Sequence, residues 1–516
     1  MKLTPGITSC TPEWQLILTQ IGVPFSTIDL SVTSGISDCP AIIVSSSLTN
    51  SEILKVLEYV SNGGTILIEA DTGHLLFNIK TQSLHIKYFE PQYDDIFAAV
   101  NGGYFDGQLR LPKHGTHLMS DSGKNLVQIY RHGEGVALIL PGGFIRGVLD
   151  TSVRRRNFPT NGPTFPSERV SRRSKGVIRA VVEKSLQFLF QKRQLPLVTL
   201  YPFPDGVSTI FNFRIDTDFS SEDDVKRLYD LCRKHNIEAT WFVETASAAN
   251  WINRYAQMEN QEIGLHCFKH RLFASFSKNQ KNVRQGVDLL TCEKLHPDGF
   301  AAPFGLWNRS LSKAVEHHGF IYSSEFALDY DNLPFYPFLR ERFSTVLQVP
   351  VHPVSTSLLR NARHTFDDMT TYLDYVIAKH VQYRLPLFFY DHPSNANLDA
   401  LNWLFERISN ISIRQMKLGD YARWWIERTS TKWTPLLEDG RIRIKQINCP
   451  ASLHVQIHRG VQEWAITEMK DEINISDLYF QPEVIAKTES PMSARSAYTW
   501  KMMVNDILHY YWKFRL

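Results

Sequence analysis

The chain has 516 residues, of which 43% are hydrophobic and 21% are charged, and its formal net charge is +3. This composition is typical of a folded protein with a large core, and so balanced a charge argues against whole-molecule attraction to nucleic acid. At about 150 residues per domain, the length predicts about three domains.

Residues 1–150 show an alternation of strand and helix patterns. CPAIIVSSS at 39–47 is a buried-strand pattern, and Thr49 and Glu52 form a capping box that opens a helix. Gly63 and Gly64 end this helix before the strand TILIEA, so we predict a right-handed crossover in a parallel sheet. Together with GEGVALILPGG, the unit loosely resembles flavodoxin-like domains of the glutamine-amidotransferase type. Because no cysteine nucleophile motif is evident, we expect a non-catalytic domain.

Residues 151–203 are predicted to form a basic linker that contains proline and glycine, followed by a helix. Arginine or lysine stands at 154–156, 169, 172, 173 and 175, around the segment NFPTNGPTFPSE. These cations could contact the phosphate of a nucleotide-linked or lipid-linked sugar, or anionic lipid headgroups, although a solvated linker is the simpler interpretation. GVIRAVVEKSLQFLFQ has the apolar face of a helix.

Two pairs of potential metal ligands lie in residues 204–429. In FRIDTDF, Asp216 and Asp218 are two apart behind an apolar run, so both can project from one face of a strand end. In QEIGLHCFKH, His266 and His270 are four apart, and on a helix they would share a face and could bind one divalent ion. Two imidazoles and one carboxylate leave positions open for water and substrate, and the second carboxylate stays available as a base. Taken alone, in a chain with 18 histidines, the histidine pair is more simply a chance surface pair.

The order of the neighbouring segments resembles a known family. STIFNFRIDTDF, EATWFVE, EIGLHCFKH, GFAAPFGLWN and PLFFYDHP follow one another as in the polysaccharide deacetylase (NodB-like, carbohydrate esterase family 4) domain. The resemblance implies a distorted (β/α) barrel with catalytic residues at the C-terminal ends of its strands. It also implies Asp218, His266 and His270 as the ligands of one divalent metal ion. Zinc is the default expectation, and cobalt, nickel and iron are the alternatives.

The resemblance assigns the other roles as well. It implies that Asp216 is the base and that His392, at the end of an apolar strand, is the acid. The peptide N–H of Phe304 is expected to donate to the oxyanion.

The third motif departs from the family pattern. The family has Arg-x-Pro-Tyr/Phe, whereas this chain has Ala301 at the arginine position. The family's arginine orients the base, so Asp216 needs another partner. Arg214 would share the face of Asp216 on a regular strand, which permits a contact without establishing it. A degenerate, non-catalytic copy of the fold is the alternative.

Weaker candidates surround these motifs. Cys267 is expected to pack rather than to bind metal. Trp307 could form a platform for a sugar ring or be buried, and Glu325 follows residues 322–324 where the family often presents a substrate-facing loop. His296 and His352 lie beside prolines, where turn or loop roles are commoner than catalytic ones.

Residues 430–516 are predicted to form a small β-rich module with a terminal helix. RIRIKQIN, LHVQIHR and EWAITEM alternate with period two, which indicates antiparallel strands. The aromatic-rich segment 496–516 is expected to form a closing helix that packs on its own chain or a sister subunit, with a membrane surface as the alternative.

These features predict a multidomain α/β protein: a flavodoxin-like parallel sheet, a distorted barrel of the NodB deacetylase type and a β-rich module. The six cysteines lack CxxC spacing, the start lacks a usual secretion signal and no run reaches ~18 apolar residues, so we expect a cytoplasmic or membrane-peripheral protein without a transmembrane segment. The expected activity is metal-dependent hydrolysis of an N-acyl group, most simply N-acetyl, on an aminosugar of a glycan or of a nucleotide-linked or lipid-linked precursor. The alternative is a catalytically silent glycan-binding or scaffold protein of polysaccharide biosynthesis.

Overall fold

A computed structural model of the chain describes residues 1–31, 36–92, 96–411, 413–447 and 453–485, together with residues 500, 503, 504, 506 and 507. The chain forms two compact units, each built from three segments. The first contains residues 1–150, 173–206 and 427–490, and the second contains residues 151–172, 207–426 and 491–516. In the described residues, no helix combines the length and the apolar character needed to cross a membrane.

The first unit contains a nine-stranded mixed sheet in the order β2-β1-β3-β4-β9-β8-β7-β5-β6. The strands from β2 to β9 in this order are parallel, and β8, β7, β5 and β6 continue the sheet as antiparallel strands. In sheet order the bounds are Ser26–Thr27, Gly6–Ile7, Ile42–Val44, Thr65–Glu69, Gly135–Leu140, Asn125–His132, His117–Ser120, Thr81–Glu90 and Gly103–Pro112.

Local sequence signals explain much of this sheet. Helix α2 (Asn50–Ser61) opens with the predicted capping box, because the Thr49 side chain accepts from the Glu52 N–H and the Glu52 carboxylate accepts from the Thr49 N–H. Strands β3 and β4 on either side of it are parallel, as predicted. The antiparallel half was not predicted, and the flavodoxin-like and amidotransferase-like assignments stay predictions. The remaining helices are α1 (Pro12–Ile21), α3 (Ala70–Phe77) and α4 (Lys175–Lys192), the last over the predicted apolar helix.

Two small antiparallel sheets complete the first unit. One has the order β12-β23-β24-β26, with bounds Leu197–Leu200, His454–Arg459, Glu463–Glu468 and Gln481–Pro482, and the other has the order β21-β22-β25, with bounds Lys432–Glu438, Arg441–Ile447 and Glu472–Asn474. The three period-two segments thus form strands, and one of them, β23, pairs with β12, which precedes the main segment of the second unit. The predicted helix at 496–516 lies largely outside the described residues.

Arg428 ties these parts of the first unit together. Its buried guanidinium donates to the carbonyls of Leu200 at 2.7 Å and Tyr201 at 2.9 Å, and to the Gln20 carbonyl in α1 at 3.3 Å. Gly22 ends α1 at φ 76°, and a Cβ there would lie 2.4 Å from the Arg428 guanidinium. Glycine is therefore required both by the backbone and by the close approach of the arginine.

The second unit is built on a parallel sheet in the order β18-β17-β16-β15-β14-β13-β19, with β20 beside β13. In that order the bounds are Leu347–Gln348, Tyr322–Ser323, Gly299–Phe300, Glu262–Leu265, Thr240–Val243, Ile210–Asp216, Leu387–Asp391 and, for β20, Arg414–Gln415. In the described residues β18 and β19 do not pair with each other, so the sheet is a curled half-barrel.

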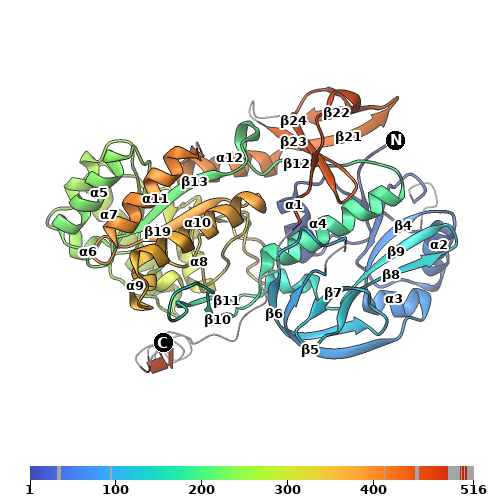
Figure 1. The fold of residues 1–516 in the computed structure, drawn as a ribbon, viewed down its shortest axis with the longest axis horizontal. Coiled ribbons are helices and arrows are strands. Elements are labelled where there is room, and N and C mark those ends of the chain that lie inside the picture. Colours follow the sequence, from blue (N-terminus) through green and yellow to red (C-terminus); the bar gives the residue numbers. More distant parts are fainter. Residues whose placement is uncertain are drawn as a thin grey trace. The chain divides into compact units, whose positions relative to one another are not determined.

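Helices surround this sheet (Figure 1). They are α5 (Glu222–Lys234), α6 (Thr245–Ala248), α7 (Phe276–Cys292), α8 (Arg309–His317), α9 (Thr356–Asn361), α10 (Phe366–Gln382) and α11 (Leu398–Asn410). The boundary between the two units falls within helix α12 (Leu418–Ser430). The basic segment at 151–172 forms an antiparallel hairpin of β10 (Val153–Asn157) and β11 (Ser167–Ser171). Because parallel strands end at one edge of a sheet, the residues that follow β13, β15 and β19 can meet there.

Candidate active site

Asp216 and Asp218 stand at the carboxyl end of β13. Asp216 is the last residue of the strand and is buried, whereas the side chain of Asp218 is 23% exposed. The strand pairs with β14 through Asp216 and Phe242, and the next N–H, of Thr217, donates to the Phe242 carbonyl at 3.1 Å. The hydrogen-bonded backbone fixes both carboxylates at the sheet edge.

His266 and His270 do not lie on a helix, so the predicted helical placement is wrong. His266 follows β15 directly, and its N–H continues the pairing by donating to the Val243 carbonyl at 2.9 Å. The loop then turns at Cys267, at φ 74°, and Asn282 from α7 accepts from the Lys269 N–H at 2.9 Å and donates to the Lys269 carbonyl at 3.0 Å. A loop anchored by an asparagine thus brings the two imidazoles together.

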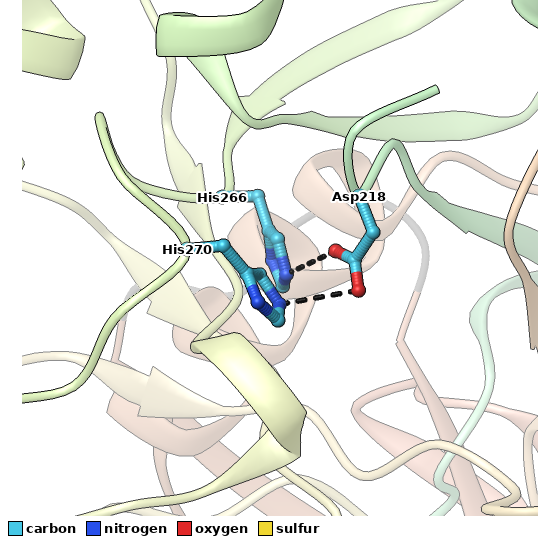
Figure 2. A group of neighbouring side chains, drawn as sticks. All are labelled: Asp218, His266 and His270. Atoms are coloured by element: carbon cyan, nitrogen blue, oxygen red, sulfur yellow. Dashed lines mark ion pairs between the residues drawn. The ribbon is translucent and has the colours of Figure 1, made fainter.

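The two imidazoles converge on the Asp218 carboxylate (Figure 2). His266 Nε2 lies 2.9 Å from Asp218 Oδ1, and His270 Nε2 lies 3.1 Å from Asp218 Oδ2. One ligand atom of each residue lies within 4.8 Å of the others. Asp218 Oδ1 and both Nε2 atoms are buried without a hydrogen bond. Close but unbonded donor atoms of these types fit a divalent metal ion.

Asp216 is held apart from this group by Arg214. The Arg214 guanidinium donates from Nε to Asp216 Oδ1 at 2.8 Å and from Nη2 to Oδ2 at 2.6 Å, and both residues are buried. Its Nη1 donates to the Ser324 carbonyl at 2.5 Å, and its charge lies 5.3 Å from the Phe242 ring centre and 5.7 Å from that of Tyr390. Bidentate pairing orients the carboxylate as well as neutralising it. Arg214 therefore orients Asp216 in a chain with Ala301 at the family's arginine position.

The electrostatics keep Asp216 ionised. Burial by itself would raise the pKa of Asp216, but the charges of Arg214 and of the nearby His266 outweigh it and lower the pKa. The Asp216 carboxylate is thus deprotonated and oriented, as a proton acceptor must be, and its lowered pKa makes it a weak base.

The segment after β17 supports Arg214 rather than facing solvent. Ser324 contacts the guanidinium, and both Ser324 and Glu325 are buried. Glu325 accepts from the Ser323 hydroxyl at 2.8 Å, and burial raises its pKa to about 7. Residues 322–325 were considered for a substrate-facing loop, and their burial contradicts that position.

His392 approaches the same group from β19. Its Nε2 lies 3.6 Å from Asp218 Oδ2, with the side chain 21% exposed. The N–H of His392 donates to Asp391 at 2.9 Å, and Asp391 also accepts from the Thr356 N–H at 3.0 Å. The buried Asp391 thus fixes the backbone that presents the imidazole.

Aromatic side chains flank the histidines. The Phe304 ring centre lies 4.4 Å from that of His270, and the Phe219 ring centre lies 5.4 Å from it. Phe219 is 67% exposed and Phe304 is 38% exposed. Trp307 is buried, so it forms no open platform, and the Cys267 thiol is buried and donates to the Lys269 carbonyl. Sequence reasoning missed Phe219, although it directly follows Asp218.

The basic hairpin also reaches this region of the second unit. The Arg169 guanidinium lies 6.0 Å from the centre of the Phe304 ring. Arg155 Nε lies 2.7 Å from Asp506 Oδ2, and Arg169 Nε lies 3.4 Å from Asp506 Oδ1. Part of the positive charge considered for a phosphate contact is thus already paired with a carboxylate.

Comparison with known proteins finds a family model that matches this part of the chain. The family model "Polysaccharide deacetylase" matches residues 214–323. This stretch is therefore similar to a polysaccharide deacetylase domain. It begins at Arg214 and contains Asp216, Asp218, His266 and His270, while His392 lies beyond it. No match was found among the curated proteins.

Some solved structures are similar to part of the chain, and their sequence identity to it is low. A protein named as a polysaccharide deacetylase from Mycobacterium smegmatis is 16% identical at a TM-score of 0.36, covering 44% of this chain and 93% of its own. A CE4 family pseudoenzyme from Bacillus anthracis is 13% identical at 0.31, covering 43% and 66%. A family 4 carbohydrate esterase from Streptomyces lividans, in complex with acetate, is 13% identical at 0.29, covering 40% and 91%.

Proposed function

We propose that the second unit is a metal-dependent hydrolase that removes an N-acyl group, most simply N-acetyl, from an aminosugar in a glycan or glycan precursor. One observation carries the proposal. Two imidazoles and Asp218 converge as a potential ligand set, while Arg214 holds the second carboxylate, Asp216, in a separate bidentate pair. Ligands and base are thus separated, as hydrolysis requires.

Asp218, His266 and His270 would hold a divalent ion, with zinc as the first choice. Such an ion, when bound, lowers the pKa of a water molecule to about 7 and polarises the acyl carbonyl. Cobalt, nickel or iron would suit the same donors.

The chain's own residues supply the proton transfers. Asp216 takes a proton from the attacking water, and Arg214 keeps its carboxylate oriented during this step. The peptide N–H of Phe304 donates to the oxyanion that develops on the acyl group. His392 then gives a proton to the leaving amine, from a position 3.6 Å from Asp218.

The surroundings of the site favour a sugar. Phe219 and Phe304 expose aromatic surface beside His270, and exposed apolar surface next to a polar site is typical of ligand binding. A nucleotide or lipid carrier on the sugar belongs to the same proposal, and the cations of the β10–β11 hairpin are its candidate contacts. We propose a non-catalytic binding or assembly role for the first unit.

The test is a screen of nucleotide-linked, lipid-linked and oligomeric N-acyl aminosugars for amine and acyl release. The protein is stripped with chelator and reloaded with zinc, cobalt or nickel. We expect release by the loaded wild type and by Asp223→Asn, an exposed control on α5, and its loss in Asp216→Asn and His266→Ala. Sugar binding without any release in every metal form would instead support the catalytically silent protein, in which Ala301 marks a lost activity.

A further inference from the structure

A second group of metal-ligand side chains lies in the second unit, away from Asp218. Asp331, His352 and His380 each offer one ligand atom, and these atoms lie within 4.8 Å of one another. Asp331 lies in the connection between β17 and β18, His352 follows β18, and His380 is in the last turn of α10. The His352 N–H donates to the Phe388 carbonyl near the start of β19, whereas His392 follows the end of that strand. The two groups therefore occupy different positions along β19.

His380 presents a lone pair to this group. Its Nδ1 lies 2.7 Å from the Pro386 carbonyl, which can only accept, so Nδ1 carries the proton. Its Nε2 lies 3.4 Å from Asp331 Oδ1 and is buried without a hydrogen bond. In the neutral imidazole, a nitrogen lone pair then faces a carboxylate oxygen inside the protein. A cation between the two atoms turns this repulsion into attraction.

His352 differs from His380, because both of its ring nitrogens have a hydrogen-bond partner. Its Nε2 lies 2.9 Å from the Tyr372 hydroxyl, and its Nδ1 lies 2.9 Å from Asp331 Oδ1. The Asp331 carboxylate can only accept, so Nδ1 donates to it and Nε2 accepts from the Tyr372 hydroxyl; a metal ion at Nδ1 would replace this proton. Metal-binding imidazoles usually donate their other N–H to such an acceptor, which fixes ring and tautomer. Pro386 is this outer acceptor for His380, and the Tyr372 hydroxyl would take the same role for His352 once Nδ1 binds an ion.

The charges and burial of the group agree with a cation site. His352 and His380 are 3% and 1% exposed. Lys379 Nζ lies 3.4 Å from Asp331 Oδ2. The lysine thus faces one carboxylate oxygen, and the other oxygen faces both imidazoles.

We propose that Asp331, His352 and His380 bind a divalent transition-metal ion in a second site, separate from the Asp218 group. Two imidazoles and one carboxylate suit zinc, cobalt or nickel, with water completing the coordination. Such an ion would join α10, the segment after β18 and the β17–β18 connection. Its role is to stabilise the fold, because the acid His392 follows the opposite end of β19.

The experiment counts metal ions in the full-length chain. His266→Ala with His270→Ala disables the first site, and the stripped protein is reloaded with zinc or cobalt and measured by elemental analysis. We expect two ions per chain in the wild type, one in this double variant, and none when His380→Ala is added. His296→Ala, an exposed histidine, is the matched control and should keep two. A double variant that binds no zinc, or a count unchanged by His380→Ala, would overturn the proposal.

Two further measurements guard against misfolding of the triple variant. Zinc should raise the Tm of the double variant, and it should leave the Tm unchanged after His380→Gln, which keeps the size of the side chain. Lys379→Met removes the competing cation, so zinc should bind this variant at least as tightly as its parent. Zinc binding that is absent from both Lys379→Met and its parent would show that Lys379 completes an ion-pair cluster that holds no metal. The counts are independent of turnover, so failure of the proposed deacylation would leave them interpretable.

Discussion

Replacing Arg214 by methionine removes the bidentate side-chain partner of Asp216 while keeping an apolar stem of similar length. The Asp216 carboxylate loses two hydrogen bonds, of 2.8 and 2.6 Å, and stays buried. Breaking a buried ion pair from one side costs about 3–5 kcal/mol. Protonation of Asp216 relieves part of this penalty, so we expect a loss of about 3 kcal/mol. A protonated Asp216 cannot act as a base, so acyl release should fall by a factor of about 10² or more.

Urea unfolding of Arg214→Met and of the wild type at pH 7 measures the loss in the free energy of unfolding. With a slope of about 2 kcal/mol/M, the midpoint should fall by about 1.5 M. Hydrogen exchange of a peptide from β13 reports the second unit separately. Arg254→Met is the matched control, because Arg254 pairs with Glu222 at 2.6 Å on the surface, with side chains 55% and 44% exposed, and exposed pairs contribute about 0–1 kcal/mol. Equal losses in the two variants would refute the reasoning.

Three further predictions concern other parts of the chain. Glu325 has a pKa of about 7 in the fold, above its unfolded value, so the free energy of unfolding should fall as the pH rises from about 4.5 to 7. Glu325→Gln should reduce this fall by about 3 kcal/mol at most. Urea titrations across that pH range measure the difference. An unchanged slope would contradict the burial of an ionisable carboxyl there. Arg428→Met leaves several buried carbonyls of the first unit without their donor, and calorimetry should show a loss of about 3 kcal/mol. Gly305→Ala places a Cβ 2.3 Å from the Phe326 ring at φ 58°, so it should lose more stability than Gly319→Ala, where φ is 78° but the space is open. Similar losses at the two glycines would show that the loop of Phe304 adjusts freely.

Local signals in the sequence carried the prediction of many elements. The capping box of Thr49 and Glu52 starts α2, and the apolar run before Asp216 is the buried strand β13, because caps and periodicity act within a few residues. The spacing of His266 and His270 is compatible with a loop as well as with a helix. The contacts that fix the loop come from Asn282 in the next helix, and the histidine motif itself contains no signal for them.

Contacts between distant segments could not be predicted in the same way. Alternation on β13 placed Arg214 and Asp216 on one face, but the bidentate pair also needs Ser324 and the rings of Phe242 and Tyr390 to hold the guanidinium. Asp331 and His352 come together because the segment after β18 hydrogen-bonds to β19, where the His352 N–H donates to the Phe388 carbonyl. His352 beside a proline was interpreted as a turn residue, since no local pattern indicated its partners.

The central claim is that Asp216 is the base, held by Arg214, and that Asp218 is a metal ligand. The measurement that tests it most directly compares metal content and acyl release in Asp216→Asn and Asp218→Asn, each reloaded with zinc. Asp216→Asn should keep the metal content of the wild type and lose release, whereas Asp218→Asn should bind less metal and lose release with it. Loss of metal from Asp216→Asn, or release that survives this substitution, would contradict the claim.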